Sequence, residues 1–145
     1  MNTIREINLS YSSNGMERVT ITDSESAYRV LLDNWDHNTL ELQEEFKALF
    51  LDRDNKVLGI YSLSKGGTAG TIVDIKLLMV AALKTKANSI ILAHNHPSGN
   101  LKPSLPDKEL TKKIKEACKF LDVHLLDHII VTSKSYYAFS DEGIL

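Results

Sequence analysis

The spacing of apolar residues changes along the first 35 residues from a period of two to a helical period. Every second residue of segment 7–11 is apolar, and the pattern recurs over residues 19–21, as in half-buried strands. The polar segment 12–15 between them, S-S-N-G, is a turn sequence, so a hairpin is predicted. Residues 22–35 then follow helical spacing and open on the capping-box sequence T-x-x-E, which predicts a helix ending near Trp35.

From residue 39 onward, short apolar runs alternate with helical segments. The strand-like runs cover residues 46–51, 57–63, 89–93, 123–131 and 136–139. The helical segments are a short stretch at 39–44, a helix over about 75–83 capped by Asp74, and a helix over about 107–121. Alternation of this kind favours an α/β fold, a mixed sheet flanked by helices.

The change of pattern near residue 39 predicts two parts. Residues 1–39 are expected to form a hairpin–helix extension packed on a domain of residues 40–145. Within that domain the glycine-rich segment 65–70 is predicted to be a loop.

Composition narrows the class of protein. The 145 residues are 43% hydrophobic and 25% charged, which is typical of a globular domain. A net charge of −2 gives no overall attraction to nucleic acid or to an anionic membrane. The N-terminus lacks a signal peptide and the longest apolar run, 77–83, is too short to cross a bilayer, so we expect a cytoplasmic protein with no membrane partner.

The single cysteine excludes an internal disulfide and any zinc site built from several cysteines. Cys118 falls among apolar residues on one face of the predicted helix 107–121. We therefore expect a buried thiol rather than a nucleophile.

The chemically distinctive stretch runs from His94 to Asp107. His94 and His96 follow a strand one residue apart, so their side chains project to the same side, and Pro97 keeps the preceding backbone extended. Asp107 opens the next helix, where the helix dipole favours a carboxylate. Two imidazoles and one carboxylate suit zinc and leave a fourth position for water, as in catalytic sites.

Each half of this stretch also has an ordinary explanation. The two histidines can be read as ordinary polar residues of a loop. Ser104 and Asp107 match S-x-x-D, a simple capping box for the helix that follows. Together, however, they spell H-x-H-x7-S-x2-D at the point where a strand ends and a helix begins, as a metal site requires.

This pattern resembles the signature of the JAMM (MPN+) metalloproteases. The surrounding stretches LFLDRDNKVLG, ILAHNHPSGN and LLDHIIV are similar to the JAMM domain of RadC-like proteins in particular. The resemblance spans about residues 40–145 and implies a fold similar to that of cytidine deaminases. Residues 1–39 fall outside it and are too short for the helix-hairpin-helix DNA-binding domain that longer RadC-like proteins carry upstream.

The resemblance also implies a catalytic glutamate two residues before the aromatic residue of the first domain strand. That position is Glu44, ahead of Phe46. The two-residue period gives Glu44 and Phe46 the same facing and Glu45 the opposite one, so Glu45 is the second candidate.

The mechanism that follows is hydrolysis by a zinc-activated water. His94, His96 and Asp107 would hold the Zn2+, which lowers the pKa of its water to about 7. Glu44 would transfer the proton to the leaving amine, and Ser104 would donate a hydrogen bond to the developing oxyanion. The resemblance implies a peptide or protein substrate, including one joined by an isopeptide bond.

Three other interpretations fit the sequence less well. A zinc nucleotide deaminase needs paired cysteines, which this chain lacks. A structural zinc site would have no use for Ser104 and Glu44. A second metal cluster of His124, Asp127 and His128 is disfavoured because a strand turns Asp127 away from both histidines; a supporting role behind the first site, or a place as core polar residues, remains open for them.

The main alternative is a nucleic-acid-associated RadC-like protein with a role in DNA repair or in mobile elements. Its interface would be the basic helix Lys108–Lys119, where lysines recur at i, i+4, i+7 and i+11. Aromatic residues of the kind that stack on single-stranded bases do not interleave that stripe.

Overall fold

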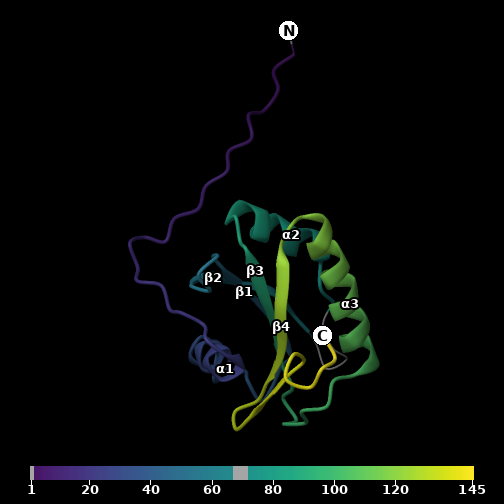
Figure 1. Cartoon of the computed structure of the whole chain (residues 1–145). Helices are drawn as coiled ribbons and strands as arrows, with labels where there is room; N and C mark the ends of the chain where they lie inside the picture. Colours follow the sequence, from purple (N-terminus) through teal and green to yellow (C-terminus); the bar gives the residue numbers. More distant parts are fainter. Residues whose placement is uncertain (1, 67–71) are drawn as a thin grey trace.

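The computed structural model describes residues 2–66 and 72–145. A central sheet carries helices on both faces, and residues 2–10 extend away from it (Figure 1). Most of the glycine-rich segment 65–70 lies outside the described residues.

The described elements are five strands and three helices. The strands are β1 (Glu45–Leu51), β2 (Val57–Lys65), β3 (Ser89–Asn95), β4 (His124–Val131) and β5 (Tyr136–Ala138). The helices are α1 (Ser24–Asp33), α2 (Ile75–Lys84) and α3 (Leu105–Phe120). In space the strand order is β2-β1-β3-β4-β5, with β3 and β4 parallel and the other neighbours antiparallel. The predicted fold class, a mixed sheet flanked by helices, is confirmed.

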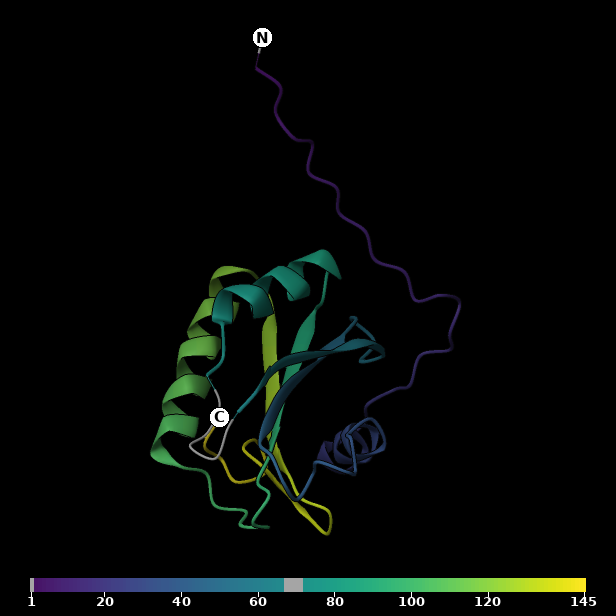
Figure 2. The ribbon, with the colours of Figure 1, turned by 180° about the vertical axis from the view of Figure 1, so that it is seen from behind.

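The sheet has two apolar faces, each covered by different helices (Figures 1 and 2). On one face Phe46, Phe50 and Leu92 pack with buried residues of α2 and α3. On the other face Leu49 and Ile91 pack with buried residues of α1. Adjacent strand residues therefore point to opposite layers, which is the two-residue period seen in the sequence.

Cys118 lies in the core between α3 and the sheet, as predicted. Burial raises the pKa of its thiol to about 11, so the reactive thiolate is scarce at neutral pH. Across residues 2–66 and 72–145, no helix is both long and apolar enough to cross a membrane.

The predicted hairpin over residues 7–21 is wrong. Ile7 and Leu9 are 85% and 76% exposed, and segment 2–12 contains no strand. Only residues 19–21 pair, as an isolated bridge between Thr20 and Lys56 beside β2. Alternation alone does not provide a partner strand, and a two-stranded hairpin without a surface to pack on is only marginally stable.

Two local predictions also need correction. The cap of α1 is Asp23, which forms its capping box with Ser26, one position after the predicted Thr22 box. The predicted helical stretch 39–44 consists of turns, which are held by hydrogen bonds from the Thr39 and Leu40 N–H groups to the Asp36 carbonyl.

Leu31→Ala tests whether α1 contributes to the stability of the domain. Leu31 is 0% exposed and belongs to the core on the α1 face. Its truncation should lower the free energy of unfolding by about 2–5 kcal/mol, measured by urea denaturation. Leu42→Ala, at a 78% exposed position, is the control and should change it by less than about 0.5 kcal/mol. Equal effects of the two changes would contradict the packing described here.

Candidate metal centre

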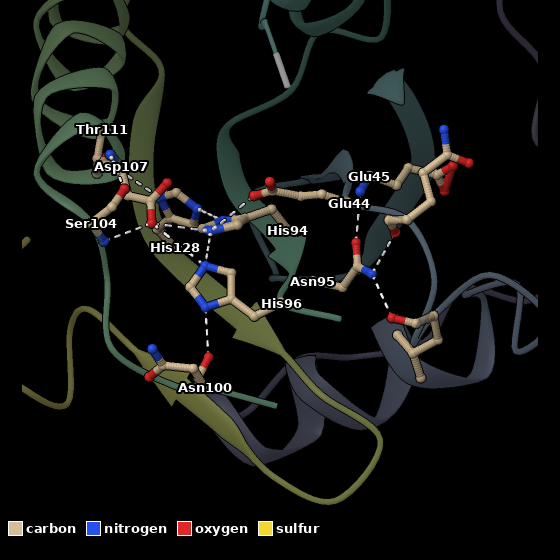
Figure 3. A network of polar contacts seen from close by, with 12 residues as sticks. Glu44, Glu45, His94, Asn95, His96, Asn100, Ser104, Asp107, Thr111 and His128 are labelled. Atoms are coloured by element: carbon tan, nitrogen blue, oxygen red, sulfur yellow. Dashed lines mark hydrogen bonds and ion pairs between the residues drawn. The ribbon is translucent and has the colours of Figure 1, made fainter. Parts of the chain in front are cut away.

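Four side chains from separate parts of the chain converge at one edge of the sheet (Figure 3). They are Glu44 just before β1, His94 in β3, His96 after β3, and Asp107 in the first turn of α3. One potential ligand atom of each lies within 4.8 Å of the other three. The structure thus brings together the three predicted metal ligands and the predicted glutamate.

The distances among the three predicted ligands fit a small divalent ion. His94 Nε2 lies 3.0 Å from His96 Nε2 and 3.4 Å from Asp107 Oδ2, and His96 Nε2 lies 3.6 Å from the same oxygen. Ligands placed tetrahedrally at 2.0–2.2 Å from zinc would be roughly 3.3–3.6 Å apart. Both distances to Asp107 fall in this range and the distance between the two histidines is about 0.3 Å shorter, so a small rotation of one ring would let the donor set hold a metal ion.

The ring of His96 is held in an orientation suited to ligation. Its Nδ1 donates a hydrogen bond of 2.6 Å to the Asn100 carbonyl, which can only accept. The lone pair of a neutral ring is then on Nε2, which faces the other two ligands. Burial lowers the pKa of His96, but Asp107 and the Asn100 carbonyl raise it by more, so the net shift is upward.

Asp107 has a local and a tertiary role. Its Oδ2 accepts from the Ser104 N–H at 2.8 Å, and Ser104 Oγ accepts from the Asp107 N–H at 3.1 Å, which closes the capping box of α3. Burial raises the pKa of Asp107, but His94 and His96 outweigh it and hold that pKa well below its usual range. Ser104 is exposed, and its hydroxyl proton remains available to donate.

The two candidate glutamates point in opposite directions (Figure 3). Glu44 Oε1 lies 3.8 Å from His94 Nε2. Glu45 is buried on the other face, where its carboxylate lies 2.7 Å from Lys47 Nζ and 3.7 Å from Lys65 Nζ. Glu44, and not Glu45, therefore belongs to the group of side chains that could hold a metal ion.

Asn95 anchors the segment that carries Glu44, a role that the sequence analysis missed. Its Oδ1 accepts from the Glu45 N–H at 2.7 Å, while its Nδ2 donates to the Leu40 and Gln43 carbonyls at 2.7 and 2.8 Å. A sequence signal existed, because an asparagine between two histidines at a strand end must face the opposite side of the sheet.

Two further polar residues lie behind His94. His94 Nδ1 is 2.7 Å from His128 Nε2, and His128 Nδ1 is 2.6 Å from Thr111 Oγ1. Burial, and then the neighbouring His94, lower the pKa of His128 well below its usual value. The sequence is compatible with a supporting role for His128, whereas the only sequence signal for Thr111 is its place one helical turn after Asp107.

His124, Asp127 and His128 do not converge on one another. His124 is exposed, whereas the buried Asp127 accepts a 2.6 Å hydrogen bond from the Ser140 hydroxyl. In the described part of the chain, the one group of side chains suited to a metal ion is the cluster around His94.

Comparison with known families gives the same assignment as the motif. A family model described as "RadC-like JAB domain" matches residues 21–144. The chain belongs to the RadC-like JAB domain family. This JAB match begins at residue 21 and so takes in α1, which the sequence analysis had assigned to an extension before the domain.

Relatives of this RadC-like JAB domain occur in several bacteria. A UPF0758 protein of Flavobacterium johnsoniae is 56% identical over 101 residues, which is 70% of this chain and 44% of that protein. UPF0758 proteins of Porphyromonas gingivalis and Aquifex aeolicus are 40% and 36% identical, over 88% and 90% of this chain and 56% and 55% of their own lengths. The chain thus spans about half the length of these curated relatives.

Asn95→Ala tests the anchor. The change removes the hydrogen-bond partner of one N–H group and two carbonyls. Each group left unpaired should lower the free energy of unfolding by about 1–3 kcal/mol. The melting temperature should therefore fall by roughly 5 °C or more in a thermal scan followed by circular dichroism. Asn88→Ala, at an exposed position just before β3, is the matched control and should melt close to the wild type. Coincident melting curves for Asn95→Ala and the wild type would refute the anchoring role.

Proposed function

We propose that this domain is a zinc-dependent hydrolase that acts on peptide or protein substrates, as a metallopeptidase or isopeptidase. In this proposal His94, His96 and Asp107 hold the ion, Glu44 is the general base, and Ser104 stabilises the oxyanion. The observation that supports it best is the approach of Glu44 to within 3.8 Å of the nitrogen that His94 offers as a ligand. Three protein ligands leave one zinc position open for a water, and a carboxylate beside them would accept the proton of that water.

The choice of zinc follows from the chemistry of the donors. Two imidazole nitrogens and one carboxylate oxygen are a common catalytic zinc set, and three protein ligands leave one position open. Bound there, zinc would supply a Lewis acid that polarises a carbonyl group and makes a water acidic near neutral pH.

The residues of the chain would then handle the protons and the developing charge. The Glu44 carboxylate accepts a proton from the attacking water and delivers it to the leaving nitrogen of the amide. The Ser104 hydroxyl, whose oxygen accepts a hydrogen bond from the Asp107 N–H, donates a hydrogen bond to the carbonyl oxygen as charge develops. Cys118 is buried in the core with a raised pKa, so it is unsuited to covalent catalysis.

A cavity of about 240 Å³ beside His96 supports access by a substrate. Its wall consists of residues 97–99, which follow His96, of residues 132–135 between β4 and β5, and of Leu40 and Glu41. Main-chain and hydroxyl groups of this kind suit the polar backbone of a peptide. We propose that the residues flanking the scissile amide or isopeptide bond bind there.

Zinc content tests the metal site. Elemental analysis of tag-free protein should give about one zinc per chain for the wild type and for His124→Ala, a control at an exposed histidine. His96→Ala and Asp107→Asn should lose the zinc while keeping their far-ultraviolet circular dichroism. Wild-type protein that contains no zinc and takes up none on addition would refute the proposal.

Glu44→Gln tests the general base. The variant should retain zinc but lose about 10²–10⁴-fold in kcat in a screen of peptide and isopeptide substrates. Glu109→Gln, on the exposed side of α3, is the control and should keep wild-type turnover. Full activity of Glu44→Gln would exclude Glu44 as the base.

The alternative, a nucleic-acid-associated protein, has one structural observation in its favour. Lys108, Lys112, Lys115 and Lys119 all line a groove of about 450 Å³ along α3, although Lys115 Nζ already donates to the Leu145 carbonyl. Such a face would give DNA affinity that falls steeply with salt and with Lys→Glu changes. We favour the hydrolase because the lysine face requires none of the groups gathered around His94.

A further inference from the structure

A continuous chain of hydrogen bonds runs from His94 into the protein core and back to α3 (Figure 3). It passes from His94 Nδ1 to His128 Nε2 (2.7 Å) and from His128 Nδ1 to Thr111 Oγ1 (2.6 Å). It ends where Thr111 Oγ1 donates to the main-chain carbonyl of Asp107 (2.7 Å). This series of hydrogen bonds thus joins two of the proposed metal ligands, His94 and Asp107, through two residues that are not ligands themselves.

The number of protons in this chain determines its direction. The Asp107 carbonyl can only accept, so the single hydroxyl proton of Thr111 is used there. Thr111 Oγ1 must then accept from His128 Nδ1, which leaves Nε2 of a neutral His128 ring as an acceptor. His94 Nδ1 therefore carries the proton of its ring, and His94 Nε2 is left with a lone pair. The reverse direction would put a proton on the nitrogen that faces the other ligands.

Aromatic packing holds both rings in the orientation that this chain needs. The Phe46 ring is parallel to His94, with centroids 5.6 Å apart and an interplanar angle of 0°. Phe139 stacks on His128 at 4.5 Å, and His128 is 0% exposed. A flip of the His128 ring, which would exchange the partners of its two nitrogens, would therefore disturb the packing of the core.

We propose that Thr111 and His128 are positioning residues of the metal centre, which fix the ring proton of His94 on Nδ1 and so direct the Nε2 lone pair at the ion. The inference rests on the proposed metal site but concerns two residues outside it. Groups that support metal-ligating histidines in this way typically contribute a factor of 10–100 to metal affinity.

The first test reads the protons directly. Long-range 1H–15N spectra of protein labelled with 15N-histidine distinguish a proton on Nδ1 from one on Nε2. In zinc-free protein both His94 and His128 should carry a proton on Nδ1, and His128 should keep it after zinc is added. A His128 ring with its proton on Nε2 would overturn the proposal.

The second test uses a matched pair of variants and zinc affinity, measured by competition with a chromophoric chelator. Thr111→Val keeps the shape of the side chain but removes the hydroxyl, and it should raise the zinc dissociation constant by about 10-fold or more. Thr111→Ser restores the hydroxyl and should bind nearly as the wild type does. Folded Thr111→Val protein with unchanged zinc affinity would overturn the proposal.

The two proposals fail in different ways. Wild-type protein that binds no zinc would refute the hydrolase, whereas the zinc-free spectra would still decide the direction of the hydrogen-bond chain. If Thr111→Val does not fold, the wild-type spectrum of His128 decides by itself. A normal zinc content with the opposite His128 tautomer would refute only the positioning role.

Discussion

The register between β1 and β3 is the constraint on which the candidate site depends. Phe46 lies opposite His94 in that antiparallel pair, so the residue two before Phe46 comes next to the metal cluster. A slip of one residue would either turn His94 toward the α1 layer, if β3 moved, or exchange the facings of Glu44 and Glu45, if β1 moved. Core packing on both faces of the sheet opposes such a slip, so the geometry of the cluster depends on the apolar residues of both layers.

The site places several polar groups in the core, and each has a partner. His94, His128 and Asn95 are fully buried, a position that is costly for any polar side chain without hydrogen bonds. Asn95 satisfies main-chain groups before β1, and His128 lies between His94 and Thr111. The same contacts that offset the cost of burial hold Glu44 and His94 in place, so stability and geometry of the site are linked.

Much of this protein could be predicted from local sequence. The α/β class, the positions of the five strands and the capping of α2 and α3 follow from periodicity and from short-range hydrogen bonds. The pattern H-x-H-x7-S-x2-D singled out a metal site because ligands near one strand end and one helix start are separated by a single loop. The family resemblance favoured Glu44, alternation along the strand predicted opposite facings for Glu44 and Glu45, and the structure turns them to opposite faces.

Only the tertiary structure decided whether the N-terminal alternating segment forms a strand and which residues lie behind His94. Residues 7–11 have the pattern of a strand, but pairing requires an available edge and an apolar surface, which sequence periodicity does not reveal. His128 and Thr111 are 17 residues apart and reach each other because β4 and α3 pack together. Local sequence determines which polar side chains are available along each strand and helix, whereas the packing of those elements determines which of the side chains come into contact.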